Sequence, residues 1–379
     1  MKIVIAPDSF KGSLTALEVG TTIQKAFLSV LPSAEVEVVP MADGGEGTLD
    51  TLLFATKGKR FQTTVMGPLG TNVEVEYGLL GDEETVIIEM AQVSGLPMVP
   101  EEKRNPMNTT SYGIGEVIKE AIQYGYQKFI IGLGGSATND GGLGMLQALG
   151  VTFLDGDSKV VPPVGSSVEK VEQVDFSTMD SRVKGCSFQI ASDVENPLCG
   201  ENGASTVFGP QKGADPEMVK RLDAALSKFA GLIENHLNVK LMEQEGAGAA
   251  GGLGFAFLAI GGEMISGSEL IAEAAHLKEK MVNADFVITG EGQSDFQTLF
   301  GKVPGYVGKL AAEHDVKALL ISGGLGKGYE ELYQYFISCD SIATGPMSLN
   351  ECLDNAESLL YKKAVNAART IQFLYQRGK

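Results

Sequence analysis

The two ends of the chain share an alternation of strand and helix patterns, and this alternation restricts the fold more than any other feature. The apolar run from Lys2 to Ala6 predicts a strand, and Val36 to Val39 predicts a second. Between them, Thr15 and Glu18 have the spacing of a capping box that begins a helix. Near the C-terminus, "DFVITGEGQSD", "VPGYVGKLAAEHD" and "VKALLISGG" repeat the order strand, helix, strand. Strands that alternate with helices pair in parallel, so both ends predict a doubly wound parallel sheet.

The middle of the chain has a different texture. Segments such as "RFQTTVMGPLG", "NVEVEYGLLG" and "ETVIIEMAQ" read as strands separated by turn residues, which predicts hairpins in a mixed sheet. We therefore predict one sheet domain built from residues 1–60 and 268–379 and a second α/β domain inserted at residues 61–267, with the active site in the cleft between them. In the sheet domain, Ser341 to Thr344 is expected to form the terminal strand and residues 349–379 one long helix.

The charge of the chain argues against large anionic partners. A formal net charge of -18 over 379 residues disfavours general binding to nucleic acid or to an anionic membrane surface, because both need a positive field. A small-molecule ligand is favoured instead. If that ligand is an anion, a few lysines and a divalent cation must be concentrated in one cleft, against the overall charge.

The sequence also points to a reducing compartment. The four cysteines are scattered without Cys-x-x-Cys spacing, and no histidine stands near enough in sequence to suggest a zinc motif. The N-terminal "MKIVIAPDSF" does not have the pattern of a signal peptide, and no apolar run approaches a membrane-spanning length. We expect a cytoplasmic protein. The sequence does not indicate its oligomeric state.

A glycine-rich loop in the inserted region raises the question of what it binds. In "KFIIGLGGSATNDGGLGMLQALG", Phe129 to Ile131 predicts a buried strand and the apolar spacing after Gly142 predicts a helix. Backbone N–H groups and a helix N-terminus favour an anion such as phosphate. The loop lacks both the dinucleotide fingerprint and the Lys-Ser/Thr pair of a P-loop, so a cation for a bound phosphate must come from elsewhere in the chain. The polar and glycine residues of the loop that we take as candidates are Gly134, Gly135, Ser136, Thr138 and Asn139.

In the sheet domain, two loops are candidates for chemistry. Ligands of doubly wound sheets bind outside the carboxyl ends of the strands, where connections leave in opposite directions, so "PDSFKGS" and "TGEGQSD" are expected to face one another. Lys11 is either a phosphate ligand or a solvated surface lysine. The acidic residues are either oxygen ligands for Mg²⁺ or residues that cap helices and form turns. These acidic residues are Asp43, Glu46, Glu291 and Asp295.

The inserted region offers further candidates. Asp193 follows a predicted strand and is placed to orient or deprotonate a hydroxyl, although the Asn-Pro turn nearby explains part of the pattern. Lys212 stands in a later glycine turn and is a candidate to bind phosphate or carboxylate. For the small-residue run "GAGAAGGLGFAFLA" we favour close helix packing over a second anion site. No histidine lies in a glycine-rich loop and no nucleophile-elbow motif is present, so a Ser-His-acid hydrolase is poorly supported.

Seven motifs in one order carry a resemblance to a known family. They are "IAPDSFKGSL", "PMADGGEGT", "GLGGSATNDGG", "NPLCGENGA", "GPQKGA", "GAGAAGGLG" and "ITGEGQSDFQT", and together they resemble the bacterial glycerate kinase family of the first type over nearly the whole chain. The resemblance implies a flavodoxin-like domain with an inserted α/β domain. It also implies ATP-dependent phosphorylation of glycerate, with 2-phosphoglycerate favoured over 3-phosphoglycerate. Two positions depart from the family pattern: Glu195 stands where Asp is expected, and Tyr306 lies near a position that usually has a small residue.

Phosphoryl transfer needs positioning and charge neutralisation more than covalent catalysis, and this requirement assigns expected roles to the candidates. The expected catalytic residues are Asp8, Lys11, Asp193, Asp295 and Lys302. The expected nucleotide- or substrate-binding residues are Ser9, Gly134, Gly135, Ser136, Thr138, Asn139, Lys212 and Gly290. The expected Mg²⁺ ligands are Asp43, Glu46 and Glu291. Whether Asp193 or Asp295 aligns the accepting hydroxyl is left open. Two other functions also stay open: a nucleotide-dependent oxidoreductase, and a sugar-acid sensor that binds without turnover.

Overall fold

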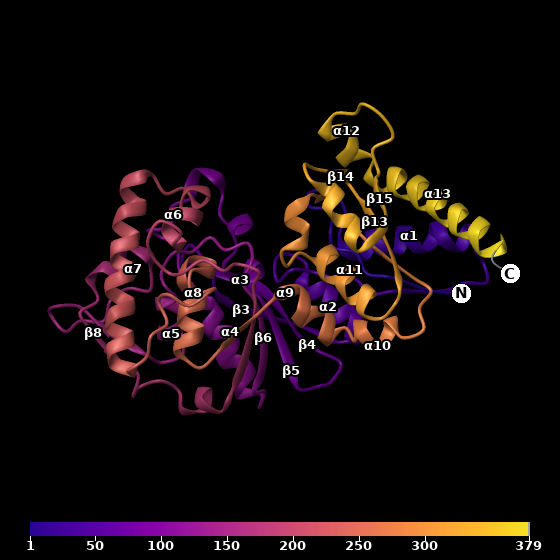
Figure 1. Ribbon diagram of the computed structural model, residues 1–379. Helices are drawn as coiled ribbons and strands as arrows, with labels where there is room; N and C mark the ends of the chain where they lie inside the picture. The colour runs from indigo at the N-terminus through magenta and orange to yellow at the C-terminus, as the bar shows by residue number, and fades with distance from the viewer. Residues whose placement is uncertain (378–379) are drawn as a thin grey trace. The chain divides into compact units, whose positions relative to one another are not determined.

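The computed structural model describes residues 1–377 and divides into two compact units. Unit 1 comprises Met1–Asp43, Asp50–Ala55 and Ser268–Lys379, and unit 2 comprises Gly44–Leu49 and Thr56–Gly267. Figure 1 traces the chain through both. Among the described residues, no helix is both long and apolar enough to cross a membrane.

Unit 1 is built on a parallel sheet whose strands come from both ends of the chain. Its five strands lie in the order β15-β13-β11-β1-β2, and each neighbouring pair is parallel. Numbered within the unit, this is the 2-1-3-4-5 order of flavodoxin-like folds read from the other edge, so the predicted fold class is confirmed. The strands are β1 (Lys2–Ile5), β2 (Glu35–Val38), β11 (Phe286–Thr289), β13 (Lys317–Ser322) and β15 (Phe336–Ser341).

Helices bury the apolar faces of this sheet. The capping box of α1 (Ala16–Val30) is present as expected: the Thr15 hydroxyl accepts from the Glu18 N–H, and the Glu18 carboxylate accepts from the Thr15 N–H. Figure 1 shows α1 beside α13 (Ala356–Arg377), and their buried side chains form one core with strands β1 and β11. The other helices of this region are α2 (Thr48–Thr56), α9 (Gly267–Ala274), α10 (Leu277–Met281), α11 (Val303–Glu313) and α12 (Leu349–Asp354).

Two sequence-based boundaries in unit 1 are wrong. We expected the terminal strand at Ser341 to Thr344, but β15 begins at the buried Phe336 and ends at Ser341. Over this range β15 pairs with β13, from Phe336 beside Ala318 to Ser341 beside Ser322. Ser341 instead begins a loop, in which its hydroxyl donates to the Gly323 carbonyl and accepts from the Ala343 N–H. The expected single helix from Leu349 is two helices. It is interrupted at Asn355, whose side-chain amide donates to the Glu351 carbonyl at the end of α12.

Unit 2 contains the separate mixed sheet. Its six strands lie in the order β10-β9-β6-β5-β4-β3; the β3–β4 and β4–β5 pairs are antiparallel and the remaining pairs are parallel. Strands β3 and β4 therefore form the predicted hairpin. The strands are β3 (Lys59–Met66), β4 (Asn72–Leu79), β5 (Thr85–Glu89), β6 (Lys128–Gly132), β9 (Ser187–Ala191) and β10 (Glu263–Ile265). A small antiparallel pair joins β7 (Thr152–Leu154) to β8 (Gln173–Asp175).

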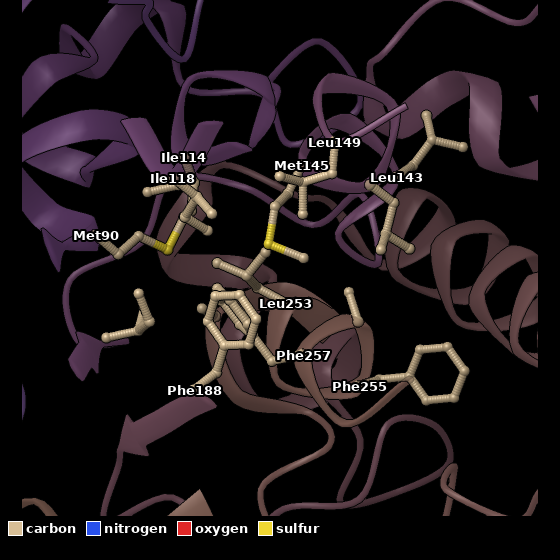
Figure 2. Close-up of a cluster of buried hydrophobic side chains, with 14 of the residues drawn as sticks. Met90, Ile114, Ile118, Leu143, Met145, Leu149, Phe188, Leu253, Phe255 and Phe257 are labelled. Atoms are coloured by element: carbon tan, nitrogen blue, oxygen red, sulfur yellow. The ribbon is translucent and has the colours of Figure 1, made fainter. Parts of the chain in front are cut away.

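Helices pack around a continuous core in this unit. Figure 2 shows Met145, Phe188 and Leu253 among its side chains, and the Phe188 ring lies 5.1 Å from Phe129 and 5.8 Å from Phe257, centroid to centroid. The α-helices are α3 (Met90–Ser94), α4 (Tyr112–Gln123), α5 (Leu143–Ala148), α6 (Ala204–Phe208), α7 (Pro216–Leu237) and α8 (Ala249–Ala259). Within α8, Gly251 has φ +70°, and a Cβ there would lie 2.0 Å from the Thr138 carbonyl oxygen. Close packing thus explains the glycines of this run, as we expected.

The ends of β11 and β13 approach so closely that Gly290 admits no side chain. A Cβ at Gly290 would lie 1.8 Å from the carbonyl oxygen of Ile321 in β13, which is backbone and cannot rotate away. We predict that Gly290→Ala lowers the free energy of unfolding by about 1–3 kcal/mol, the usual cost of overpacking. The matched control is Gly324→Ala, where a Cβ meets nothing within 4 Å and the expected change is within about 0.5 kcal/mol. Equal midpoints of urea unfolding for the two variants would contradict this account.

Candidate active site

A pocket of about 1060 Å³ opens at the carboxyl ends of the unit 1 strands. It includes the point where β1 and β11 lie side by side while their connections leave toward opposite edges of the sheet, which is where doubly wound folds bind ligands. Backbone hydrogen bonds join the loops that follow these strands: the Asp8 N–H donates to the Gly290 carbonyl (2.9 Å), and the Gly323 N–H donates to the Glu291 carbonyl (2.9 Å). The two loops that we expected to face one another therefore line one pocket.

Two lysines bring positive charge to this pocket. The Lys11 ammonium lies 3.2 Å from Asp43 Oδ2, yet 74% of its side chain is exposed. The Asp43 carboxylate is the main reason that the pKa of Lys11 is raised, so Lys11 stays charged. Lys302 is the N-cap residue of α11, and its ammonium lies 3.7 Å from Glu291 Oε2 and 3.9 Å from Asp295 Oδ1. Both ammonium groups remain accessible enough to contact a phosphate.

Two acidic residues of the pocket, Asp8 and Glu291, have environments that disfavour their negative charge. Burial, and then the neighbouring Asp43 carboxylate, raise the pKa of Asp8 to about 7, although the Ser9 N–H donates to Asp8 Oδ1. Burial also raises the pKa of Glu291, against the effect of hydroxyl hydrogen bonds from Thr298 and Ser294. Asp8 is thus poised to change its protonation near neutral pH, and any bound cation would favour its ionised form.

The carboxylates fit a magnesium ion that is shared with phosphates. Within residues 1–377, no group of three or more His, Cys, Asp or Glu side chains is arranged to hold a metal ion. Mg²⁺ commonly uses only one or two carboxylates and completes its shell with water and substrate phosphate oxygens. Of the three expected ligands, Asp43 and Glu291 line the pocket of unit 1, whereas the exposed Glu46 belongs to unit 2.

The remaining candidates of unit 1 have clear structural contacts. Ser9 lines the pocket. The Gly290 carbonyl accepts a hydrogen bond from the Asp8 N–H, and the absence of a side chain at Gly290 leaves room for the backbone of β13. Asp295 caps the short 3-10 helix Phe296–Leu299 by accepting a hydrogen bond from the Gln297 N–H at 2.9 Å. The same carboxylate also forms an ion pair with the Lys302 ammonium. Tyr306, the unusual residue, is half-buried within α11.

In unit 2, the glycine loop does receive a cation from a distant part of the chain. Lys212 is almost fully buried, and its ammonium donates to Ser136 Oγ at 2.8 Å and to the Thr138 carbonyl at 2.7 Å. Burial lowers the pKa of Lys212 to about 7, against the opposing effect of Asp140. Lys212 therefore holds the loop together. Asn139 donates from Nδ2 to Ser205 Oγ at 2.8 Å, and its buried Oδ1 has no hydrogen-bond partner among the described residues.

Sequence analysis missed the residue that organises this loop, Asp140. Its buried carboxylate accepts from the N–H groups of Ser111, Gly142 and Gly144 and from the Ser111 hydroxyl. The N–H groups of Gly134 and Ala137 also donate within the protein, to the carbonyls of Gly44 and Ser94. Much of the donor set that we expected to bind phosphate is therefore used internally. The signal was the Asp in "NDGG", since an Asp before glycines at a helix start commonly caps that helix.

Asp193 lies on the surface of unit 2 rather than in a buried site. Its Oδ1 accepts from Ser266 Oγ at 3.0 Å and from the Gly267 N–H at 2.8 Å. Asp193 thereby fixes the segment that leads into α9. Its expected role toward a substrate hydroxyl stays a prediction, as does a cleft shared by the two units.

Comparison with known proteins decides the family. The family model described as the glycerate kinase family matches residues 3–372. The chain belongs to the glycerate kinase family. A glycerate kinase of Halalkalibacterium halodurans is 46% identical over 97% of each chain, and a glycerate 2-kinase of Escherichia coli is 44% identical over 98% of each. The crystal structure of a Salmonella typhimurium LT2 protein assigned as a glycerate kinase 2 has a TM-score of 0.89 at 44% identity and covers 99% of each chain.

Membership in the glycerate kinase family confirms the resemblance that the seven motifs carry. It also confirms, at the level of the family, the expected class of enzyme: a phosphotransferase with an alcohol group as acceptor. The unit 1 pocket of the present chain combines the accessible ammonium groups of Lys11 and Lys302 with the buried carboxyl groups of Asp8 and Glu291.

The raised pKa of Asp8 predicts a pH-dependent effect on stability. Below about pH 4 the Asp8 carboxyl is protonated in both folded and unfolded chains; between pH 4 and 7 the unfolded chain ionises first, which costs folding free energy. Asp8→Asn removes this cost and keeps an oxygen for the Ser9 N–H. Without Mg²⁺, the variant should gain on the order of a few kcal/mol above pH 7 and almost nothing near pH 4.

Urea unfolding at both pH values tests this prediction. The exposed Asp315 supplies a control, since Asp315→Asn should leave stability nearly unchanged at either pH. An Asp8→Asn gain that is larger at pH 4 than at pH 8 would show that burial and Asp43 do not act on Asp8 as described.

Proposed function

We propose that the protein is a glycerate kinase that transfers the γ-phosphoryl group of ATP to a hydroxyl group of glycerate, with Mg²⁺. The observation that carries the proposal is the pocket at the carboxyl ends of β1 and β11, where Lys11 and Lys302 stand beside Asp8, Asp43 and Glu291. Because phosphoryl transfer depends mainly on positioning and charge neutralisation, this arrangement suits it.

Each group of the pocket has a proposed part in the reaction. Lys11 and Lys302 would bind phosphate oxygens and stabilise the charge that develops on the transferring group. Asp8, Asp43 and Glu291 would hold Mg²⁺, with phosphate oxygens as further ligands. The metal would neutralise negative charge on the phosphates. Asp295, beside Lys302, would orient the accepting hydroxyl or receive its proton, and Asp193 is the alternative. Lys212 and the Ser136–Asn139 loop are proposed to serve the glycerate side, because the Lys212 amino group lies against this loop and would be charged beside a bound carboxylate.

We propose 2-phosphoglycerate as the product. Support comes from the relative in Escherichia coli that is named glycerate 2-kinase and is 44% identical. Phosphorus NMR of a reaction with Mg-ATP and glycerate, compared with authentic 2- and 3-phosphoglycerate, decides between the two products. A reaction that consumes ATP points to the cytoplasm as the place of action, and all four cysteines are free thiols.

Two other functions give different results in simple assays. A nucleotide-dependent oxidoreductase predicts a larger thermal shift with NAD than with Mg-ATP. A sugar-acid sensor predicts glycerate binding without ADP formation. The proposed kinase predicts a shift with Mg-ATP and ADP formation that depends on glycerate. Coupled measurement of ADP release therefore identifies the kinase, and thermal shifts with NAD and with glycerate separate the other two.

The first kinetic prediction concerns the lysines. Lys11→Ala and Lys302→Ala should each lower kcat/KM on the order of a hundredfold, the usual cost of removing a donor from developing charge. Lys309, exposed on α11 and outside the pocket, supplies the control: Lys309→Ala should keep near wild-type turnover. Equal kcat/KM for ATP in all three variants would return Lys11 and Lys302 to surface roles.

The second kinetic prediction separates the acids. Asp295→Asn keeps the cap of the 3-10 helix but removes its charge, so turnover should fall strongly while Mg²⁺ and ATP binding stay nearly normal if Asp295 acts on the hydroxyl. A metal ligand should instead show a higher Mg²⁺ requirement. Asp193→Asn should be the milder change, because Asn still accepts from the Gly267 N–H. Full activity and an unchanged Mg²⁺ requirement in both variants would exclude both residues.

A further inference from the structure

The unit 1 pocket is longer than its charged part. It runs along the carboxyl ends of β1, β11, β13 and β15, from Asp8 and Glu291 past Gly324 to the loop of residues 341–345. These four strands are consecutive in the sheet, and at about 4.8 Å between neighbours their ends span roughly 14 Å. Glycerate spans only about 5 Å between its end groups, given bond lengths near 1.5 Å. The pocket is therefore sized for a longer ligand.

The far end of the pocket has a different chemistry from the near end. The residues of β15, its following loop and α12 that line the pocket carry no ionisable carboxylate or ammonium group. Most of the side chains that line this far end are apolar or small. Ile342 and Ala356 form a buried floor, whereas Leu349 is largely exposed. The principal members of this apolar end are Ile342, Ala343, Met347, Leu349, Leu353 and Cys352.

We propose that this apolar end binds the purine base of ATP, with the triphosphate extending along the pocket toward Lys11 and Lys302. The direction of the phosphates rests on the proposed function; the position of the base rests on the lining of the pocket. A flat, mostly apolar base gains from burial against such side chains, whereas a hydroxylated acid loses hydrogen bonds to water there. This end is also lined by Ala343, Thr344 and Gly345. Because these residues have short side chains or none, their backbone groups are within reach of the polar edge of a base.

The middle of the pocket fits the sugar that joins the two ends. Gly323 and Gly324 follow β13 there. A Cβ at Gly323 would lie 2.4 Å from the Gly292 carbonyl oxygen, so this position stays without a side chain for packing reasons. Gly324 differs, because a Cβ there meets nothing within 4 Å. Gly324 therefore leaves open space between the charged and apolar ends, and a bulky side chain would fill it.

The glycine loop of unit 2 is the competing position for the nucleotide, and its contacts argue against it. Asp140 accepts the N–H groups of Gly142 and Gly144, so a carboxylate already occupies donors that a phosphate would need. The Lys212 ammonium already donates hydrogen bonds to Ser136 Oγ and to the Thr138 carbonyl. In the unit 1 pocket, the Lys302 ammonium forms ion pairs with Glu291 and Asp295 at 3.7 and 3.9 Å, which are longer than hydrogen bonds, so these carboxylates do not occupy its N–H donors in the same way.

Direct binding of Mg-ADP to the full chain tests the proposal without requiring turnover. Gly324→Leu should raise the Kd for Mg-ADP at least tenfold in titration calorimetry. Gly231→Leu, in α7 of unit 2 and with nothing within 4 Å of its Cβ, is the matched control and should leave the Kd unchanged. Circular dichroism melting shows whether each variant is folded.

The thiol of Cys352 gives a second readout in the unaltered protein. Of the four cysteines, Cys352 lines this pocket, while Cys186 and Cys199 belong to unit 2. Mg-ADP and adenosine should each slow alkylation of Cys352 by iodoacetamide at least fivefold, and should leave the rate at Cys186 unchanged. Glycerate and inorganic triphosphate, which lack a base, should not protect Cys352. Peptide mass spectrometry measures both thiols in one sample.

The outcomes separate this proposal from the proposed function. Protection of Cys352 and the Gly324→Leu effect in a protein that forms no ADP with glycerate would support the base site and defeat the kinase assignment. Glycerate-dependent ADP formation with an unchanged Kd in Gly324→Leu and no protection of Cys352 would overturn the base site while the kinase assignment stands. Absence of Mg-ADP binding by the wild-type protein would also overturn the base site.

Discussion

The parallel pairing of β1 with β11 is the contact on which the candidate site depends. It joins residues from opposite ends of the chain in register, Ile5 beside Ile288, and the hydrogen bond from the Asp8 N–H to the Gly290 carbonyl extends it into the loops. Since parallel strands place their carboxyl ends at one edge, this pairing brings Lys11 and Glu291 to one pocket although some 280 residues separate them in the sequence. Gly290 permits the arrangement because β13 leaves no space for a Cβ.

The electrostatics of the pocket follow from the same pairing. Asp8 and Glu291 are buried by the neighbouring strand ends, and burial raises the pKa of each carboxyl, whereas Lys11 and Lys302 stay accessible at the rim. A protein with a net charge of -18 can bind a highly anionic ligand only where lysines and a shared cation oppose that charge locally. The pocket meets this condition at its β1–β11 end, and the apolar lining at β15 and α12 is where we propose that the base of a nucleotide binds.

The sequence predicted those features that depend on local patterns. Alternating strands and helices, the Thr15–Glu18 capping box and the position of the two loops at the β1–β11 edge follow from periodicity and from the general topology of parallel sheets. Features that depend on tertiary contact were missed. Nothing near Ser136 indicates that Lys212 will bind it from 76 residues away, and the acceptor role of Asp140 toward Ser111 is equally non-local. The end of β15 at Ser341 was misplaced because the register of Phe336 on β13 is set by packing, which the apolar pattern alone does not show.

We propose that the phosphates of ATP bind at the charged end of the unit 1 pocket. The most direct test is a crystal structure of the full chain with Mg²⁺, a non-hydrolysable ATP analogue and glycerate. Phosphate oxygens are expected within hydrogen-bond distance of the Lys11 and Lys302 ammonium groups, with the metal bound to a carboxylate among Asp8, Asp43 and Glu291. Phosphates bound instead at the loop of Gly134 to Asn139, with the unit 1 pocket filled by water, would contradict it.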